Sequence, residues 1–279
     1  MQLKRIIPLL LLPVLAILLM LPFFGQISAL TNSTSDAQLE AGVQEIVDRG
    51  VLRVGVKQDL PNFGYRDPKS NKYTGMEVEI AKKVAAELGV DIEFTPVTAQ
   101  TRGALLDNGQ LDMVIATFTI TEERKELYNF TTPYYTDAVG FLVRKDSNIQ
   151  SSWEALDGLT IGVTQGSIQW GLLEEIAAEK GIELNFRELG SNSEVVVALA
   201  AHRVDAFSID QSILSAFLGK TNELLDLQYQ PSEYGIVTKK SNTDLATYLD
   251  GLVQDWTEDG TLQAIYDDFG LKPVTEIDE

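Results

Sequence analysis

From Val51 onward, short β-branched runs alternate with segments of helical periodicity. The run 51–56 has the length of a strand, and 75–88 places apolar residues at 76, 80, 84 and 88 before Gly89. Thr74 and Glu77 have the spacing of a capping box for that helix. Further strands are expected at 91–97, 112–116, 159–163, 182–188 and 204–209, with helices at 101–106 and around 245–256. This alternation predicts an α/β fold with mainly parallel sheets and helices on both faces.

The N-terminal thirty residues do not follow this pattern. Lys4 and Arg5 precede an uncharged apolar segment, 6–24, and small residues follow near Ala29. A positive flank, an apolar core and a small-residue end are typical of a secretory signal, and the segment is also long enough for an uncleaved anchor. We therefore expect 1–29 to be a signal peptide or membrane anchor and 30–43 to be a polar tether. Either alternative places the rest of the chain outside the cytoplasm, in the periplasm or at the outer face of the cytoplasmic membrane.

Charge and composition exclude several classes of function. The chain carries 41 acidic and 22 basic residues, a net charge of -19, which disfavours nucleic acid and anionic lipid. Without cysteine there is no disulfide, catalytic thiol or lipidated Cys, and a single histidine, His202, leaves little room for a Ser-His-Asp triad or a zinc site. Dinucleotide-binding, P-loop, zincin and nucleophile-elbow motifs are missing from the sequence. We expect no enzyme, no metal and no cofactor.

The segments that follow four of the expected strands carry polar and charged groups. In open α/β sheets these carboxyl ends are where ligands bind. The relevant segments begin at Lys57, Thr117, Thr164 and Asp210. Together they supply cations, hydroxyls, backbone N–H groups at helix starts and one carboxylate. Such a set suits a small zwitterion, whose carboxylate needs cations and whose ammonium needs a carboxylate.

Each of these residues also has a plain structural interpretation. The alternatives are helix N-caps for Thr121 and Asp210, solvated surface charges for Lys57, Arg102 and Arg124, a core position for Phe118 and a surface helix end for His202. For any single residue the structural interpretation is the more common one. The recurrence of complementary groups at four strand ends favours a binding site.

At these loops the sequence resembles the extracytoplasmic amino-acid-binding proteins of ABC importers, solute-binding family 3. The resemblance spans about 50–271 and rests on LRVGVK (52–57), GMEVEIA (75–81), IATFTITEER (115–124), TPYY (132–135), VTQGS (163–167) and RVDAF (203–207). It implies a two-lobed periplasmic-binding-protein (Venus-flytrap) fold. The two lobes are expected to be joined by crossover strands at 138–143 and 234–239. Lobe 1 is then 44–140 plus 236–275, and lobe 2 is 141–235.

The resemblance also implies a role for each site residue. The α-carboxylate of an amino acid is expected at Arg124, with Thr119 beside it and the helix start Ser167, Ile168 and Gln169 opposite. The ammonium is expected at Asp210 and the carbonyl of Thr117, with Phe118 lining the pocket. Lys57 and Arg102, with their flanking residues, match the acidic-amino-acid subgroup and are expected to face the side chain of the ligand.

These expectations define a function. The resemblance implies a monomeric receptor that delivers glutamate or aspartate to a membrane permease and its ATPase by closure of the two lobes around the ligand. A glutamine or other polar amino-acid binder of the same transport type is one alternative. The other is a secreted, dehydratase-like enzyme on the same fold, which would need a general acid or base facing the substrate.

Overall fold

The computed structural model describes residues 40–274. The predicted signal or anchor, 1–29, and most of the predicted tether lie outside the described residues. Helix α1 (Ala41–Arg49) begins inside the segment 30–43, and its Val43 and Ile46 are buried. Arg49 and Arg53 both bind Asp112, at 2.5 and 2.7 Å, which fixes α1 beside the first sheet. Within 40–274 no helix combines the length and the apolar character that crossing a bilayer requires.

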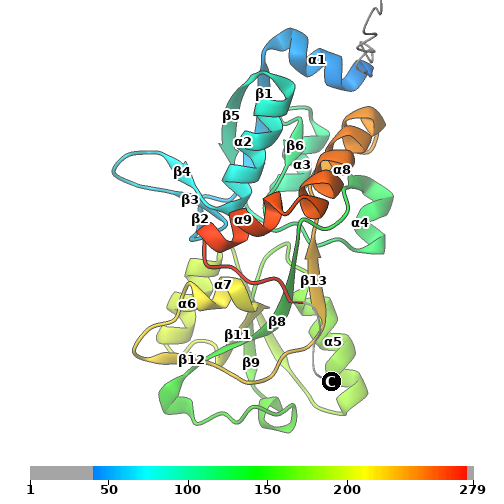
Figure 1. Ribbon diagram of the computed structural model, residues 1–279. Helices are drawn as coiled ribbons and strands as arrows, with labels where there is room; N and C mark the ends of the chain where they lie inside the picture. The colour runs from blue at the N-terminus through cyan, green and yellow to red at the C-terminus, as the bar shows by residue number, and fades with distance from the viewer. Residues whose placement is uncertain (1–39, 275–279) are drawn as a thin grey trace, which may run out of the picture. The chain divides into compact units, whose positions relative to one another are not determined.

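The first sheet has five strands in the order β5-β1-β6-β14-β7 (Figure 1). They are β1 (Val51–Val56), β5 (Asp91–Pro96), β6 (Met113–Val114), β7 (Tyr128–Phe130) and β14 (Val237–Lys239). Strand β1 runs parallel to β5 and β6, whereas β14 runs antiparallel to β6 and β7. The sheet therefore combines an N-terminal parallel part with a strand that returns from late in the chain.

Helices cover both faces of this sheet. They are α2 (Met76–Leu88), α3 (Arg102–Asp107), α4 (Glu122–Leu127), α8 (Thr243–Glu258) and α9 (Thr261–Asp268). On one face, Val54 of β1 shares a buried core with Ile80 of α2 and Leu249 of α8. On the other face, Leu106 of α3 packs with Val114 and neighbouring residues. A small sheet of β2 (Asp59–Leu60), β3 (Gly64–Arg66) and β4 (Tyr73–Thr74) lies between β1 and α2 in the chain.

The start of α2 differs from the sequence prediction. Its N-cap is Gly75, with φ +128°, and no side chain caps the helix. A Cβ at Gly75 would lie 2.1 Å from the carbonyl oxygen of Phe63, so the close approach of the β2–β3 segment requires glycine there. The capping box of Thr74 and Glu77 is wrong, because the Glu77 side chain is fully buried. The prediction that Gly89 ends the helix is confirmed by its left-handed conformation.

The second sheet has the order β10-β9-β11-β8-β12, and β13 also pairs with β8. Its strands are β8 (Tyr135–Arg144), β9 (Thr160–Thr164), β10 (Asn185–Leu189), β11 (Ala206–Asp210), β12 (Asn222–Leu224) and β13 (Pro231–Tyr234). The connecting helices are α5 (Gln169–Lys180), α6 (Asn192–Ala200) and α7 (Gln211–Ser215), with 3-10 turns η1 (Lys145–Ser147) and η2 (Glu154–Leu156). Parallel pairing again holds for β9, β10 and β11, and β8 and β12 are antiparallel. Both sheets are therefore mixed.

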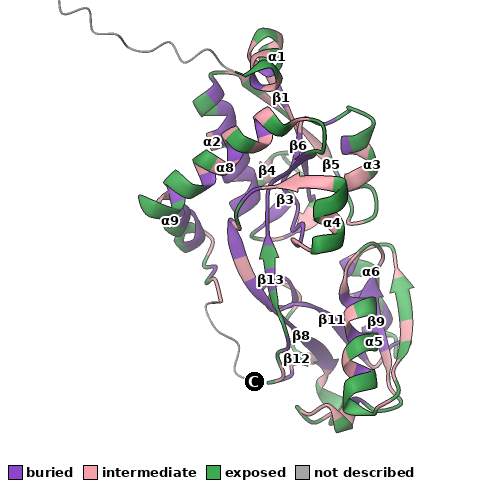
Figure 2. Ribbon diagram, turned by 90° about the vertical axis from the view of Figure 1, so that its right-hand side faces the viewer, coloured by how far each residue is buried: buried purple, intermediate pink, exposed green. Residues whose placement is uncertain are grey.

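Two antiparallel strands connect the sheets. Strand β8 pairs with β13 from Tyr135↔Tyr234 to Ala138↔Pro231, and both run between the sheets in Figures 1 and 2. The expected crossing at 234–239 is divided into β13 and β14, which are separated by Gly235 and Ile236. The prediction of a two-lobed α/β fold is confirmed. The lobe boundaries 44–140 plus 236–275 and 141–235 stay a prediction.

Candidate functional site

The carboxyl ends of β1, β6, β9 and β11 meet at a small cavity. Most of the predicted site residues line it, namely Lys57, Arg102, Thr117, Thr119, Ser167, Ile168, Gln169 and Asp210. Ala99, Thr164, Asn192 and Ile209 complete the lining. Phe118 and Arg124 line an adjoining cavity that shares Ala99, Ser167 and Ile168 with the first. The topology thus brings the predicted residues into one region of the molecule.

Lys57 is a buried cation, with 4% of its surface exposed. Its ammonium forms none of the ion pairs found among residues 40–274. Burial lowers the pKa of Lys57, and the charges of Asp59 and Glu77 oppose that shift. The alternative of a solvated surface charge is therefore wrong for Lys57. A buried ammonium group without a partner is costly, so an anionic ligand group at this position would be stabilising.

Arg102 is also buried, and it is partly committed to the protein. Its Nη1 donates to the carbonyl oxygens of Ala116, at 2.6 Å, and Thr117, at 2.9 Å. The guanidinium lies 3.8 Å from the ring centroid of Phe118, a cation–π contact. Burial, and secondarily the charge of Arg124, lowers the pKa of Arg102 to about 9. Arg102 therefore shapes the cavity wall and leaves only part of its fork for a ligand.

Thr117 has a strained backbone, because its φ of +45° is rare for a β-branched residue. Two charged groups hold it there. Its N–H donates to Glu77 Oε1 at 2.5 Å, and its carbonyl accepts the bond from Arg102. Glu77 also accepts a bond of 2.6 Å from the Tyr134 hydroxyl, and burial raises the pKa of its carboxyl. Strain of this kind persists where surrounding groups impose it, commonly at binding sites.

We expect Glu77→Ala to lower the free energy of unfolding by about 2–3 kcal/mol, because two buried partners lose a charged acceptor. Urea unfolding measures this change. Glu79→Ala on the same helix is the control, since Glu79 pairs with Lys82 at the surface and is expected to matter little. Equal unfolding curves for Glu77→Ala and Glu79→Ala would show that the Thr117 clamp does not stabilise the fold.

Arg124 joins the loop after β6 to the loop after β9. Its Nη1 donates to the carbonyl of Thr119 at 2.9 Å, and its Nη2 donates to the carbonyl of Gly166 at 3.2 Å. Burial lowers the pKa of Arg124 to about 10. Thr121 Oγ1 accepts the backbone N–H of Arg124, so the N-cap interpretation of Thr121 is confirmed. A Cβ at Gly166 would lie 2.7 Å from the backbone nitrogen of Gln100, which shows how closely the loop after β9 approaches the segment between β5 and α3.

The opposite wall consists of two helix starts. Helix α5 begins at Gln169 after Ile168, without a side-chain cap, so its first N–H groups remain available for an anion. Asp210 occupies the N-cap position of α7, but its side chain makes no capping bond, and the capping interpretation is therefore wrong. It is 4% exposed, its Oδ1 has no partner within 40–274, and burial raises its pKa.

Phe118 has the core position that the structural interpretation predicted. It packs with Val97 and Leu106, and 4% of its surface is exposed. Its ring contacts the guanidinium of Arg102.

Sequence reasoning missed several residues of the site. Glu77 was taken for a capping residue, and Asn192, whose Oδ1 accepts a bond from Thr164 Oγ1, was not considered. Asp137 was also missed, although it is the only charged residue between 130 and 143. A lone carboxylate in an apolar segment is the signal that points to a buried role.

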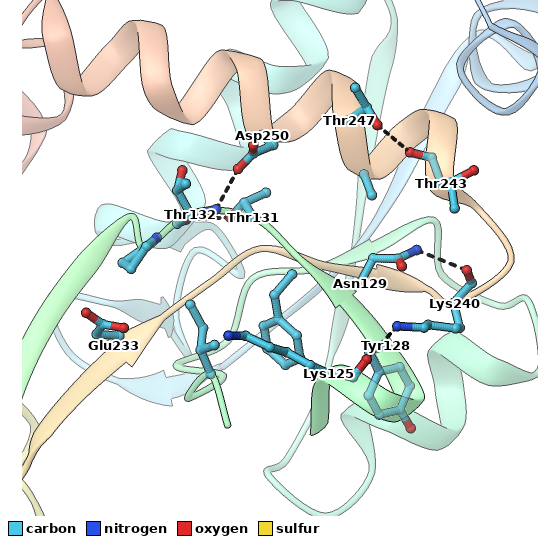
Figure 3. Close-up of a pocket in the computed structure, with 14 residues that line it drawn as sticks. Lys125, Tyr128, Asn129, Thr131, Thr132, Glu233, Lys240, Thr243, Thr247 and Asp250 are labelled. Atoms are coloured by element: carbon cyan, nitrogen blue, oxygen red, sulfur yellow. Dashed lines mark hydrogen bonds between the residues drawn. The ribbon is translucent and has the colours of Figure 1, made fainter. Parts of the chain in front are cut away.

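A further cavity lies between α8, β7 and the β13–β14 segment (Figure 3). Its polar groups mostly serve the fold. Asp250 accepts a bond of 2.6 Å from the Thr132 N–H, and Lys240 donates to the carbonyl of Lys125 at 2.5 Å. Asn129 donates to the carbonyl of Lys240 at 3.2 Å. The cavity at the strand ends, with its buried and unpartnered charges, is the stronger candidate for a ligand.

The fold and the site define a class of protein, a two-lobed α/β protein with charged groups at the strand ends of both sheets. Comparison with known proteins agrees. The model of the bacterial extracellular solute-binding proteins, family 3, matches residues 52–272, and the chain belongs to this family. It is a substrate-binding protein of amino-acid ABC import, a class of extracellular or periplasmic receptors.

Individual relatives bind different amino acids. A glutamine-binding protein of Geobacillus stearothermophilus is 35% identical over 71% of this chain and 76% of its own length. The glutamate-binding protein GluB of Corynebacterium glutamicum is 28% identical over 80% of each chain. The structure of AbpA from Streptococcus pneumoniae bound to L-arginine superimposes with a TM-score of 0.73, at 27% identity, over 81% of this chain and 97% of AbpA. These names do not identify the side chain that this site accepts.

Proposed function

We propose that the protein binds glutamate or aspartate outside the cytoplasm and delivers it to the permease and ATPase of an ABC importer. The observation that carries this proposal is the buried Lys57 side chain, which lines the cavity and forms none of the ion pairs found among residues 40–274. A ligand with a second carboxylate would neutralise it. A ligand with an apolar or cationic side chain would leave it unpaired or add repulsion.

The other groups fit the backbone of an amino acid. The α-carboxylate would meet Arg124, Thr119 and the start of α5 at Ser167, Ile168 and Gln169. The ammonium would meet Asp210. The side-chain carboxylate would reach Lys57 and the part of Arg102 that the carbonyls of Ala116 and Thr117 leave free.

The charge balance around the cavity also supports an acidic ligand. Lys57, Arg102 and Arg124 are three cations, and none of them forms an ion pair within 4.0 Å among residues 40–274. Burial raises the pKa of Glu77 and of Asp210, which weakens the negative charge that these groups can supply. A ligand with net charge −1 reduces the excess of positive charge around the cavity, whereas a neutral zwitterion leaves this excess unchanged.

Glutamine is the second candidate. Its support is the similarity to a glutamine-binding protein and the commitment of Arg102 Nη1 to two backbone carbonyls. Glutamine is nearly isosteric with glutamate, and its amide oxygen could accept a bond from Lys57. The bond would lack a charge on the acceptor, and charge-assisted bonds are about twice as strong. We therefore expect glutamine to bind more weakly than glutamate.

The alternative of another class is a dehydratase-like enzyme on this fold. The buried carboxyls of Glu77 and Asp210 are the groups near the cavity whose pKa is raised, as a general acid requires. Glu77 is held by Thr117 and Tyr134, and its second oxygen is buried without a partner among the described residues. The relatives reported above are named as binding proteins, which supports binding without turnover.

Isothermal titration against the common amino acids tests the proposal, with mass analysis of the recovered ligand. We expect unaltered glutamate or aspartate at one per protein, with an affinity at least tenfold above that of glutamine, equal to about 1.4 kcal/mol. Glutamine binding as tightly as glutamate would support the second candidate. Preference for lysine, arginine or leucine would contradict both, and chemical conversion would identify an enzyme.

A further inference from the structure

Asp137 is a buried carboxylate on the connecting strand β8, with 1% of its surface exposed. It pairs opposite Ser232 of β13. Its oxygens accept the backbone N–H of Ser212, at 3.2 Å for Oδ2 and 3.3 Å for Oδ1, and Oδ1 also accepts its own strand's Ala138 N–H at 2.8 Å. Asp137 therefore binds the start of α7 from a neighbouring element.

This contact takes the place of an ordinary N-cap. An N-cap aspartate usually accepts the N–H of the second or third helical residue, and in α7 the second residue is Ser212. Asp210 holds the N-cap position, yet Ser212 donates to Asp137 instead. As a consequence the carboxylate of Asp210 is available at the ligand cavity, with its Oδ1 unpartnered among the described residues.

The two carboxylates also influence each other's charge. Burial, and then the charge of Asp210, raises the pKa of Asp137 to about 7. Burial raises the pKa of Asp210, and the hydroxyls of Ser232 and Tyr234 oppose this shift. The other ionisable groups that act on the pair are Tyr135, Tyr229, Tyr234, Arg102 and Arg124. Near neutral pH Asp137 is therefore partly protonated.

We propose that Asp137 is a positioning residue of the ammonium site. It binds the start of α7 so that Asp210 Oδ1 is free for the ligand, and ligand binding at Asp210 releases a proton from this pair of carboxyl groups. The ligand keeps all three protons of its ammonium group. The O–H bond of the protonated carboxyl breaks, and the proton passes to the buffer. The inference rests on the proposed placement of the ammonium at Asp210, and it does not depend on acidic selectivity.

Titration calorimetry in buffers of different ionisation enthalpy measures the protons released. With L-glutamate and with L-glutamine at pH 6, we expect a release approaching one proton per ligand, falling toward zero at pH 8. Both ligands should give the same number at pH 6, because they share the ammonium group. Lys57 would change the proton count in the opposite direction. Because its pKa is lowered, glutamate binding would favour proton uptake by Lys57 at high pH. No proton release at pH 6 with either ligand would overturn the proposal.

Two substitutions of Asp137 separate positioning from a general structural role. Asp137→Asn keeps an acceptor for Ser212 but not the charge, so the proton release should move to lower pH and the affinity at pH 6 should rise by up to about tenfold per unit of pKa shift. Asp137→Ala loses the acceptor as well as the charge, and the α7 start then competes for Asp210, so Asp137→Ala should bind more weakly than Asp137→Asn. Asp205→Asn is the control, because Asp205 bonds the N–H of Thr160 in the second sheet, away from the cavity lining.

The outcomes discriminate clearly. Unchanged proton release in Asp137→Asn, or equal affinities of Asp137→Ala and Asp137→Asn, would overturn the proposal. Proton release that moves in Asp137→Asn but not in Asp205→Asn would support it. The same titrations also give the affinities for glutamate and glutamine. If glutamate does not bind more tightly than glutamine, the proposed acidic selectivity is wrong, and this result is separate from the proton release.

The stability of Asp137→Asn should also depend on pH. In the unfolded chain an aspartate loses its proton near pH ~4, and in the folded protein Asp137 loses it at about 7. Between these values the folded state binds more protons, so the wild type loses stability as pH rises, and the full cost is present above pH ~7. Asp137→Asn should therefore melt higher than the wild type at pH 8, with a difference that shrinks toward pH 4. A difference that is constant across this range would contradict the assignment.

Discussion

Arg124→Ala and Asp210→Ala should each weaken amino-acid binding by roughly 30- to several-thousand-fold, because truncating one partner of a buried charge pair costs about 2–5 kcal/mol. Arg124 provides the guanidinium for the α-carboxylate and already bonds the carbonyls of Thr119 and Gly166. Asp210 provides the one carboxylate in the cavity lining. Titration calorimetry on folded variants measures both losses.

Lys125→Ala is the matched control for Arg124. Lys125 lies next to it on α4 and pairs with Glu122 at the surface, where a pair contributes little. We expect this variant to bind like the wild type. If Arg124→Ala also binds like the wild type, Arg124 is a contact between the loops and not the carboxylate site. The same result for Asp210→Ala would remove the proposed ammonium site.

The second large effect concerns selectivity. Lys57→Met should weaken glutamate and aspartate far more than glutamine, because it removes the cation that an acidic side chain neutralises. The expected loss for the acidic ligands is about 2–3 kcal/mol, or some 30- to 150-fold, as for a charged hydrogen bond. The affinity for glutamine should fall much less, so the preference for acidic ligands over glutamine becomes smaller or reverses. The measurement is the ratio of the two dissociation constants in each variant.

Arg102→Met should also weaken glutamate and aspartate more than glutamine, and it should destabilise the fold. The carbonyls of Ala116 and Thr117 lose their donor in this variant, and the Phe118 ring loses its cation. Thermal unfolding of each variant separates this effect from selectivity. Equal losses for glutamate, aspartate and glutamine in Lys57→Met would show that Lys57 supports closure of the site and does not distinguish side chains.

Much of the fold follows from local sequence patterns. Strand β1, helix α2 and its end at Gly89 could be predicted from hydrophobic periodicity and a C-terminal glycine, because both signals are local. Antiparallel pairing of β8, β13 and β14 could not, because it depends on where the chain returns after a whole lobe. The wrong capping box of α2 has a different reason. Gly75 packs closely against Phe63, and Glu77 is buried because it bonds Thr117 and Tyr134, contacts that the spacing of Thr74 and Glu77 does not reveal.

The site shows a similar division. The rule that parallel strands end at the same edge of a sheet brings Lys57 and Thr117 together in the first sheet and Thr164 and Asp210 together in the second. That both edges meet at one cavity follows from the two-lobed fold. The roles of Glu77 and Asp137 depend on partners far along the chain. Glu77 bonds Thr117, and Asp137 bonds Ser212, so the spacing of neighbouring residues contains no signal for either contact.

The central claim is that Lys57 binds the side-chain carboxylate of the ligand. A crystal structure of the protein with L-glutamate tests it most directly. The account predicts that a side-chain carboxylate oxygen lies about 2.7–2.9 Å from Lys57 Nζ, the usual length of a charge-assisted bond, while the ammonium contacts Asp210. A glutamate side chain directed away from Lys57, or an α-carboxylate bound there in its place, would contradict it.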